Sequence, residues 1–274
     1  MLNNNPLRQY FRRPCLYFKL PSEGKYYLPG IVDIPANGEL PVYPMTAIDE
    51  MTIRTPDGLF NGAAVIELIK SCIPNILDPW KLNNVDLDAV LIAIRAAANN
   101  GKMSIDSECP SCHEKTEYEI DLMPMLTDMK DVNYNQVLKL RELEIKFKPL
   151  TFEDTNKNGL DQMDIQRSLM NLDSYPDEEK QVEMNKTLKK LNNMVIKVVS
   201  DTIDYIRTPE LTVTEKEYII EFLNNCDRET NNTIKDYSIK LRETSELKPI
   251  NVKCPQCQHD YQQKIVLNVT DFFG

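Results

Sequence analysis

The spacing of apolar residues changes along the chain and predicts different secondary structure in its two halves. Up to residue 44, apolar residues stand in short runs between prolines, and ten of the seventeen prolines lie within residues 1–79. Proline fixes φ and lacks a backbone donor, so this region favours extended and turning backbone over long helices. We expect short strands over 15–20, 25–28, 31–34 and 39–43. Asn37-Gly38 predicts a hairpin turn between the last two.

Helical patterns begin after residue 45. We predict helices over 47–53, 62–72 and 85–98. Thr46 is placed to cap the first helix, Pro74 stops the second, and Pro56-Asp57-Gly58 predicts a turn between them. The third helix is apolar on almost every side, which indicates a central, buried position.

Residues 123–247 contain a single glycine and a single cysteine and follow another pattern. Apolar and charged residues alternate over 143–150, which together with 136–140 predicts a β-hairpin. Beyond residue 151 the apolar residues recur at helical spacing. We predict helices over 152–172, 177–202, 214–224 and 228–242. Thr214 is placed to cap the third of these helices.

The composition is that of a folded protein. The chain has 274 residues, 42% of them hydrophobic and 27% charged, which suits one to three domains of roughly 100–200 residues. Its longest apolar run, 89–94, is far shorter than the about 20 residues of a membrane span. The N-terminus lacks the apolar core of a secretory signal. We therefore expect the seven cysteines in a reducing cytosol, where paired cysteines are more often metal ligands than disulfides.

Charge is distributed unevenly. The net charge of −10 disfavours non-specific binding to nucleic acid, which depends on neutralising phosphates. Residues 1–30 are basic by contrast, and their arginines and aromatic residues form a basic arm: Arg8, Tyr10, Phe11, Arg12, Arg13, Tyr17 and Phe18. This arm could clamp nucleic acid, dock on an acidic partner protein, or pack as a strand on its own domain. No glycine-rich phosphate loop occurs in the sequence, which argues against nucleotide enzymes of those classes.

A weak internal repeat relates residues 105–122 to residues 250–267, with an offset of 145 positions. The matching positions are Ile105 with Ile250, Cys109-Pro110 with Cys254-Pro255, Cys112 with Cys257, Ile120 with Ile265 and Leu122 with Leu267. Each copy reads as a strand, a C-P-x-C turn and a second strand. Alternating apolar residues on either side of each turn support the strands.

The paired turns predict one structural zinc site per chain. A C-x-x-C turn holds two thiolates at two corners of a zinc tetrahedron, so two such turns close the shell. The predicted ligands are Cys109, Cys112, Cys254 and Cys257. A closed four-thiolate shell leaves no coordination position for water or substrate, which indicates a structural and not a catalytic ion. Two hairpins meeting at one metal form a zinc ribbon.

Other readings of these cysteines are weaker. The sequence CPSCH at 109–113 matches a haem attachment motif, but the second copy reads CPQCQ and lacks the histidine. A thioredoxin-like redox pair opens a helix, whereas both copies here run into strands. The third alternative is that the two C-P-x-C turns have lost their metal. The two histidines, His113 and His259, flank the turns, and four thiolates leave no need for either as a ligand.

Little in the sequence supports catalysis. Both histidines lie beside the predicted metal site, so no credible Ser-His-Asp or Cys-His arrangement emerges. The remaining cysteines, Cys15, Cys72 and Cys226, are isolated, and Cys72 fits a buried apolar helix face. We expect that the protein is not an enzyme.

The order of motifs in the first half resembles a known family. It runs NPLRQYFRRP, YFKLPSEGKYYLPG, VYPMTAIDEMTIRTPDGLFNG, VIELIKSCIPNILDPW and DLDAVLIAIRAAANNGKM, and then reaches the first C-P-x-C turn. This order is similar to a family of T-even-like tailed-phage baseplate hub subunits and hub assembly proteins. The resemblance implies a tail-baseplate component or a hub-assembly factor without enzymatic activity.

These observations predict an α+β protein. We expect a mixed N-terminal domain with its basic arm (1–101), a discontinuous zinc ribbon (102–122 and 248–274), and a mainly helical insertion with a β-hairpin (123–247). The expected function is structural or assembly work in a baseplate hub, and the alternative is a zinc-ribbon regulatory factor associated with nucleic acid. Expected partners are other baseplate, hub or tail proteins, with no membrane and no nucleic acid. We expect the protein in the host cytoplasm during assembly and in the virion tail baseplate if it is retained.

Overall fold

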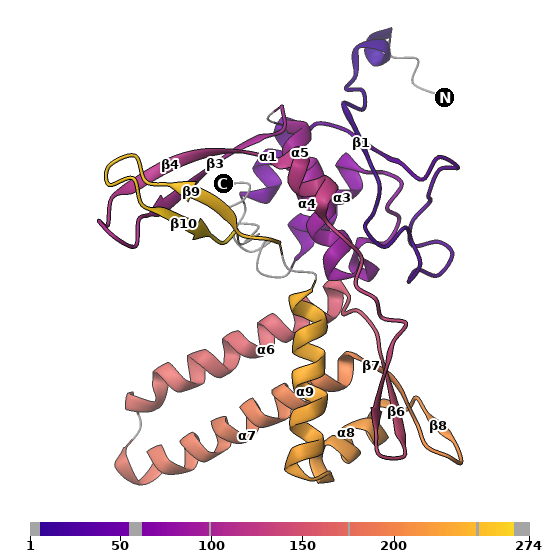
Figure 1. The fold of residues 1–274 in the computed structure, drawn as a ribbon, viewed down its shortest axis with the longest axis vertical. Coiled ribbons are helices and arrows are strands. Elements are labelled where there is room, and N and C mark those ends of the chain that lie inside the picture. Colours follow the sequence, from indigo (N-terminus) through magenta and orange to yellow (C-terminus); the bar gives the residue numbers. More distant parts are fainter. Residues whose placement is uncertain (1–5, 55–61, 99, 175, 245–246, 266–274) are drawn as a thin grey trace. The chain divides into compact units, whose positions relative to one another are not determined.

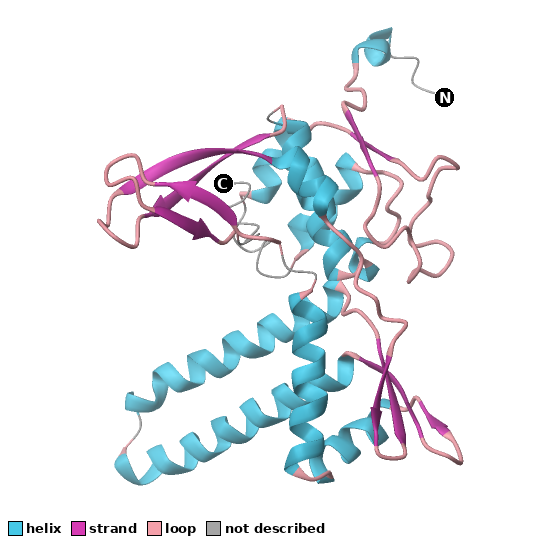
Figure 2. Ribbon diagram, viewed as in Figure 1, coloured by secondary structure: helices cyan, strands magenta, loops and turns pink. Residues whose placement is uncertain are grey.

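The computed structural model describes residues 6–54, 62–98, 100–174, 176–244 and 247–265. The protein is α+β, as predicted, and its contacts divide the chain into two compact units (Figures 1 and 2). The first unit comprises residues 1–130 and 247–274, and the second comprises residues 131–246. The turn predicted at 56–58 lies outside the described residues.

Three predicted helices of the first unit are confirmed as α1 (Ala47–Ile53), α3 (Ala63–Cys72) and α4 (Asn84–Ala98). Thr46 caps α1: its hydroxyl accepts a hydrogen bond from the Asp49 N–H at 3.2 Å, and the Asp49 carboxylate accepts from the Thr46 N–H at 2.7 Å. This reciprocal pair satisfies two N–H groups that the first helical turn leaves open. Because α4 is buried on most sides, it forms the centre against which α3 and α5 (Leu122–Asp128) pack.

The N-terminal strands differ from the prediction. β1 (Leu16–Phe18) pairs antiparallel with β2 (Leu40–Val42), which confirms strands within 15–20 and 39–43. The strands predicted at 25–28 and 31–34 are wrong, since that backbone turns repeatedly and only Val32 forms an isolated bridge, to Ile76. The predicted hairpin is therefore wrong as well. Asn37-Gly38 does turn the chain, but it delivers β2 to β1 instead of to 31–34.

A buried carboxylate, Asp86, explains why residues 20–28 leave the sheet. It accepts hydrogen bonds from the Ser22 N–H at 2.9 Å, the Ser22 hydroxyl, the Tyr27 hydroxyl at 2.5 Å and the Asn83 amide at 2.9 Å. Hydrogen bonds to a charged group contribute about 1.5–3 kcal/mol each. They anchor the segment to the N-terminus of α4 and outweigh its strand propensity. Burial raises the pKa of Asp86, and the donors oppose that rise.

Two β-hairpins complete the described part of the first unit. β3 (Lys102–Glu108) pairs with β4 (Lys115–Asp121), and β9 (Ile250–Lys253) pairs with β10 (Asp260–Gln263). Figure 1 draws the yellow β9–β10 hairpin beside the purple β3–β4 hairpin, although the whole second unit separates them in the sequence. Two 3₁₀ turns, η1 (Pro6–Tyr10) and η2 (Pro79–Lys81), lie in the same unit.

The second unit packs helices against a small antiparallel sheet. The sheet has the order β5 (Val137–Leu140), β6 (Leu143–Phe147), β7 (Ile203–Arg207) and β8 (Thr212–Val213). The helices are α6 (Phe152–Met170), α7 (Asp177–Asp201), α8 (Lys216–Asn225) and α9 (Arg228–Glu243), with η3 (Asn171–Ser174) after α6. Their shared core includes Ile145, Phe147, Ile203, Ile219 and Ile234. Figure 2 shows α6 and α7 running side by side as the long helical pair of this unit.

The predicted hairpin and the four predicted helices of this region are confirmed, with shifts at their ends. Thr214 is not the cap of α8, because the helix begins one residue later and Glu215 occupies the cap position. β7 and β8 were not predicted. Their sequence alternates only briefly. β7 pairs with β6, which lies far away in the chain, and β8 then pairs with β7.

Candidate metal centre

The two C-P-x-C turns share one backbone conformation. In each turn the N–H of the first cysteine donates to the carbonyl five residues later, and the N–H four residues later donates back to that cysteine's carbonyl, all at 2.9 Å. The bonded pairs are Cys109 with Glu114 and His113 with Cys109, then Cys254 with His259 and Gln258 with Cys254. His113 and Gln258 both lie in the left-handed region, with φ of 59° and 61°. The internal repeat is therefore a repeat of local structure.

The turns bring the four cysteine sulfurs together. The Sγ atoms of Cys109 and Cys257 lie 3.6 Å apart, as do those of Cys112 and Cys254, and all four sulfurs lie within 4.8 Å of one another. A zinc tetrahedron with Zn–S bonds of about 2.3 Å separates its sulfurs by about 3.8 Å. A disulfide would require about 2.05 Å, and all four cysteines are free. The arrangement therefore has the dimensions of a four-thiolate metal site.

Burial is the same in both turns. The first cysteine of each pair, Cys109 or Cys254, is buried, and the second, Cys112 or Cys257, is exposed. The site is thus half enclosed, and each turn contributes one inner and one outer sulfur. An ion in it would be reached from the side of the outer sulfurs.

Electrostatics of the cluster favour a bound cation. Burial acts to raise the pKa of Cys109, but the N–H groups of Cys112 and Ser111 outweigh it and lower that pKa to about 6. The N–H of Glu114 acts to lower the pKa of Cys112, yet the neighbouring thiols raise it to about 12. Backbone N–H groups thus favour the Cys109 thiolate, and the neighbouring thiols oppose ionisation of Cys112. Four thiolates require a cation between them.

Polar contacts away from the sulfurs also join the two hairpins. The buried Ser107 hydroxyl on β3 lies 2.9 Å from the Tyr261 hydroxyl and donates to Gln263 Oε1 at 2.6 Å, both on β10. The Tyr118 hydroxyl on β4 donates to the Lys253 carbonyl at 3.1 Å. These residues were missing from the predicted site. Their only sequence signal is that they occupy inward positions of strands flanking the cysteines, and nothing local indicates which residues meet.

The structure bears on two alternative roles of these residues, a redox pair of cysteines and ligation by the histidines. Each turn continues into a strand, β4 or β10, and not into the helix that a thioredoxin-like pair opens. The side chain of His113 lies 3.1 Å from the Glu108 carboxylate, and the ring of His259 stacks on Tyr261 at 6.3 Å. Neither histidine belongs to the sulfur cluster.

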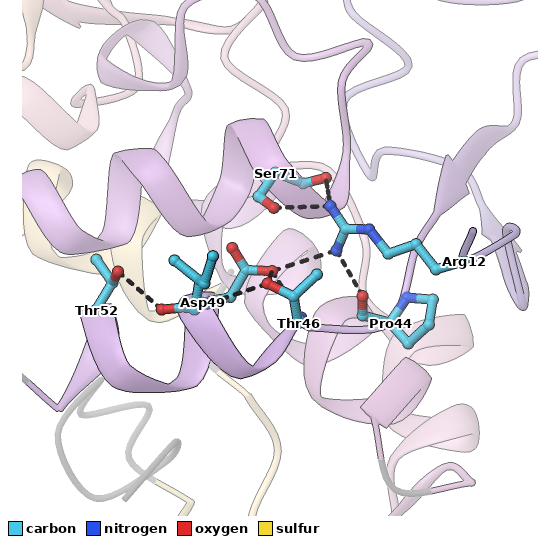
Figure 3. Close-up of polar contacts among 7 residues, drawn as sticks. Arg12, Pro44, Thr46, Asp49, Thr52 and Ser71 are labelled. Atoms are coloured by element: carbon cyan, nitrogen blue, oxygen red, sulfur yellow. Dashed lines mark hydrogen bonds and ion pairs between the residues drawn. The ribbon is translucent and has the colours of Figure 1, made fainter. Parts of the chain in front are cut away.

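The predicted basic arm divides at Arg12, which Figure 3 shows bound to its own domain. The guanidinium donates to the Pro44 carbonyl at 2.6 Å, to Asp49 at 3.2 Å, and to the carbonyl and hydroxyl of Ser71, both at 2.8 Å. It also lies 5.8 Å from the centre of the Tyr43 ring. Burial opposes ionisation of Asp49, but the Thr46 and Ser71 donors and Arg12 lower its pKa. Arg12 thus links the arm to α1 and α3.

The parts of the arm on either side of Arg12 behave differently. Beyond it, β1 packs on the domain and Phe18 is buried, as the strand interpretation expects. Before it, Tyr10 is 77% exposed and Phe11 is 56% exposed. Arg8 and Arg13 are exposed too. Only residues 6–13 therefore keep the character of a docking segment.

The other cysteines lie apart from the cluster. Cys72 is fully buried, and burial raises its pKa to about 12, so it acts as a small apolar residue, as expected. Cys15 is exposed, and Cys226 is intermediate. Across the described ranges, no helix combines the length and apolar character needed to cross a bilayer.

Comparison with known proteins gives one finding. A family model described as "T4 bacteriophage base plate protein" matches residues 31–274, which include both cysteine pairs and the whole second unit. The comparisons with curated proteins and with solved structures found no match. The family match agrees with the resemblance drawn from the order of sequence motifs.

Proposed function

Because the chain belongs to the T4 bacteriophage base plate protein family, we propose that it is a structural or assembly component of a tailed-phage baseplate hub. It acts through contacts with other baseplate, hub or tail proteins. It assembles in the host cytoplasm, and the finished tail retains it if it is a subunit and not an assembly factor. The family match over residues 31–274 is the observation that carries this proposal.

Within that role, the four cysteines hold one zinc ion and the two hairpins form a zinc ribbon. The support is geometric: sulfurs 3.6 Å apart across the two turns suit a tetrahedral four-thiolate shell. Zinc fits better than a harder cation, because thiolates select zinc over magnesium or calcium. With four protein ligands the ion is structural.

The zinc serves as a staple that joins residues 109–112 to residues 254–257, two segments of the first unit. The whole of that unit, residues 131–246, lies between Cys112 and Cys254 in the sequence. Closing so long a loop costs only slightly more than closing a short one, because the entropy grows with the logarithm of length. Structural zinc contributes about 10–16 kcal/mol in small zinc fingers. The ion therefore holds together the two chain segments that flank the unit in the sequence, at modest entropic cost.

We also propose that the protein is not an enzyme. The cluster offers a metal four protein ligands, so a substrate would have to displace one of them. The alternative role, a nucleic-acid-associated ribbon factor, has little support. The exposed face of the β3–β4 hairpin carries carboxylates at Asp106, Glu108, Glu117, Glu119 and Asp121, which would repel phosphates.

Two measurements test these proposals separately. Metal analysis of the purified protein is expected to give about one zinc per chain, because one four-thiolate site fills with one ion. A folded, metal-free protein would exclude the staple and leave the baseplate role standing. For that role, mass spectrometry of tail assembly intermediates and finished virions is expected to detect the chain in at least one of them. Its absence from both would refute the role.

A further inference from the structure

The two hairpins at the cysteine cluster present different outer faces. On β3–β4, alternate side chains point away from the other hairpin, and these exposed positions hold five carboxylates against two lysines, Lys102 and Lys115. The equivalent face of β9–β10 holds Asn251, Lys253, Asp260 and Gln262. One face is strongly acidic and the other is balanced. If the charges served only to keep the protein soluble, the two exposed faces would not need to differ in this way.

The acidic face includes an unfavourable pair in the isolated chain. Asp106 and Glu117 are direct cross-strand partners, and both are exposed. Like charges placed directly opposite on a sheet destabilise it. A recess opens beside this pair, lined by Asp106, Ser107, Glu108, Lys115, Thr116 and Glu117. A guanidinium can bind two carboxylates at once through its planar fork and would remove the repulsion.

The same chain carries a segment of complementary chemistry. Residues 6–13 include Arg8, Arg12 and Arg13 and no carboxylate. Arg12 fixes the base of the segment to its own domain, while Tyr10 and Phe11 project as exposed aromatic side chains. Both the segment and the acidic face stay exposed in the single chain, so a partner for either comes from another molecule.

We infer that residues 6–13 of one copy bind the outer face of the β3–β4 hairpin of a second copy, with Arg8 and Arg13 meeting Asp106 and Glu117. Each copy offers one segment and one face, so two copies can exchange segments in a two-fold dimer or bind head-to-tail. Head-to-tail contacts build a ring when the rotation closes and a filament when it does not. The inference deepens the proposed structural role and rests on it only for its biological setting.

A charge-swap experiment on the full-length protein tests the contact. The first variant, R8E/R13E, has an acidic segment and an acidic face, and the second, D106K/E117K, has a basic segment and a basic face. Each alone is expected to self-associate at least tenfold more weakly than the natural chain in sedimentation velocity. An equimolar mixture is expected to associate again, because opposite charges then meet in both directions. Raising the salt concentration is expected to weaken the natural contact, since exposed ion pairs are screened.

The controls separate this contact from general charge effects. N251K/Q262K places two lysines on cross-strand partners of the other hairpin and is expected to leave association unchanged. Deleting residues 1–11 removes Arg8, Tyr10 and Phe11 but retains Arg12, and is expected to weaken association at least tenfold without lowering thermal stability. A natural chain that stays monomeric at every concentration tested overturns the inference, and so does a mixture that fails to restore association. Neither result bears on whether the protein is present in tails.

Discussion

The two hairpins at the cysteine cluster use one turn and two different sets of strands. Their C-P-x-C turns match bond for bond, including the left-handed residue after the second cysteine. Yet β3 and β4 are seven residues long, whereas β9 and β10 have four residues each. The difference shows which positions the two hairpins share: the cysteines and the backbone around them are alike, while the neighbouring strand positions diverge.

The inner faces diverge as well. Ser107 and Val252 occupy the same position of the repeat, two residues before the first cysteine, and both are buried. Ser107 binds Tyr261 and Gln263 on the opposite hairpin, whereas Val252 offers only apolar surface. The hairpins are thus similar at the cysteines and complementary on their inner faces, where one hairpin supplies the hydroxyl and the other its partners.

Loss of one ligand is expected to have the largest effect on this pair. Cys254→Ser leaves three thiolates and breaks the staple, so zinc content is expected to fall below half an ion per chain. The free energy of unfolding is expected to drop by several kcal/mol, a fraction of the about 10–16 kcal/mol of small zinc fingers. Zinc analysis and thermal unfolding with and without a chelator measure both. Cys109→Ser is expected to match it, since the two cysteines are equivalent.

Cys226→Ser is the matched control for that experiment. Its sulfur lies in the second unit, 3.7 Å from the Leu223 carbonyl and outside the cysteine cluster, so zinc content and stability are expected to stay near those of the natural chain. If Cys254→Ser kept full zinc and full stability, the two turns would not share a metal. The structural equivalence would then have no energetic counterpart.

Local and long-range features of this centre were not equally predictable. The four cysteines could be found from the sequence because C-P-x-C is a local motif and its repetition marks a pair. The Ser107–Tyr261–Gln263 contacts could not, since they depend on which inward positions meet across hairpins distant in the chain. The fold shows the same division. α1, α3 and α4 follow from local periodicity and caps. The strand expected at 25–28 was overridden by distant Asp86, and the backbone of 31–34 bonds to residues 75–78 instead.

The inner-face contact gives the next largest expected effect. Ser107→Ala removes the hydroxyl and leaves the Tyr261 hydroxyl and the Gln263 amide with fewer partners at a partly buried site. Losing hydrogen-bond partners in such a place costs about 1–3 kcal/mol. The fall is expected in denaturant unfolding, with zinc content unchanged because the sulfurs are untouched.

A double-mutant cycle with Tyr261→Phe shows whether the energy belongs to this contact. Residues that bond directly couple by about 0.5–3 kcal/mol, so the double variant is expected to lose less than the two single variants together. Strict additivity would mean that Ser107 and Tyr261 act independently. The two hairpins would then be joined mainly through the metal.

The smallest expected effect concerns the left-handed residues and tests the turns themselves. Left-handed backbone costs a side-chain-bearing residue about 1–2 kcal/mol, and glycine avoids this cost but loses about 0.5–1 kcal/mol of additional chain entropy on folding. Gln258→Gly and His113→Gly are each expected to stabilise the protein by a few tenths of a kcal/mol, and by similar amounts because their φ angles agree within a few degrees. High-precision thermal unfolding of both variants measures the two gains. A stability gain at one turn and a loss of more than 1 kcal/mol at the other would contradict this expectation. It would mean that the replaced side chain itself stabilises its turn. His113, paired with Glu108, is the residue to examine first.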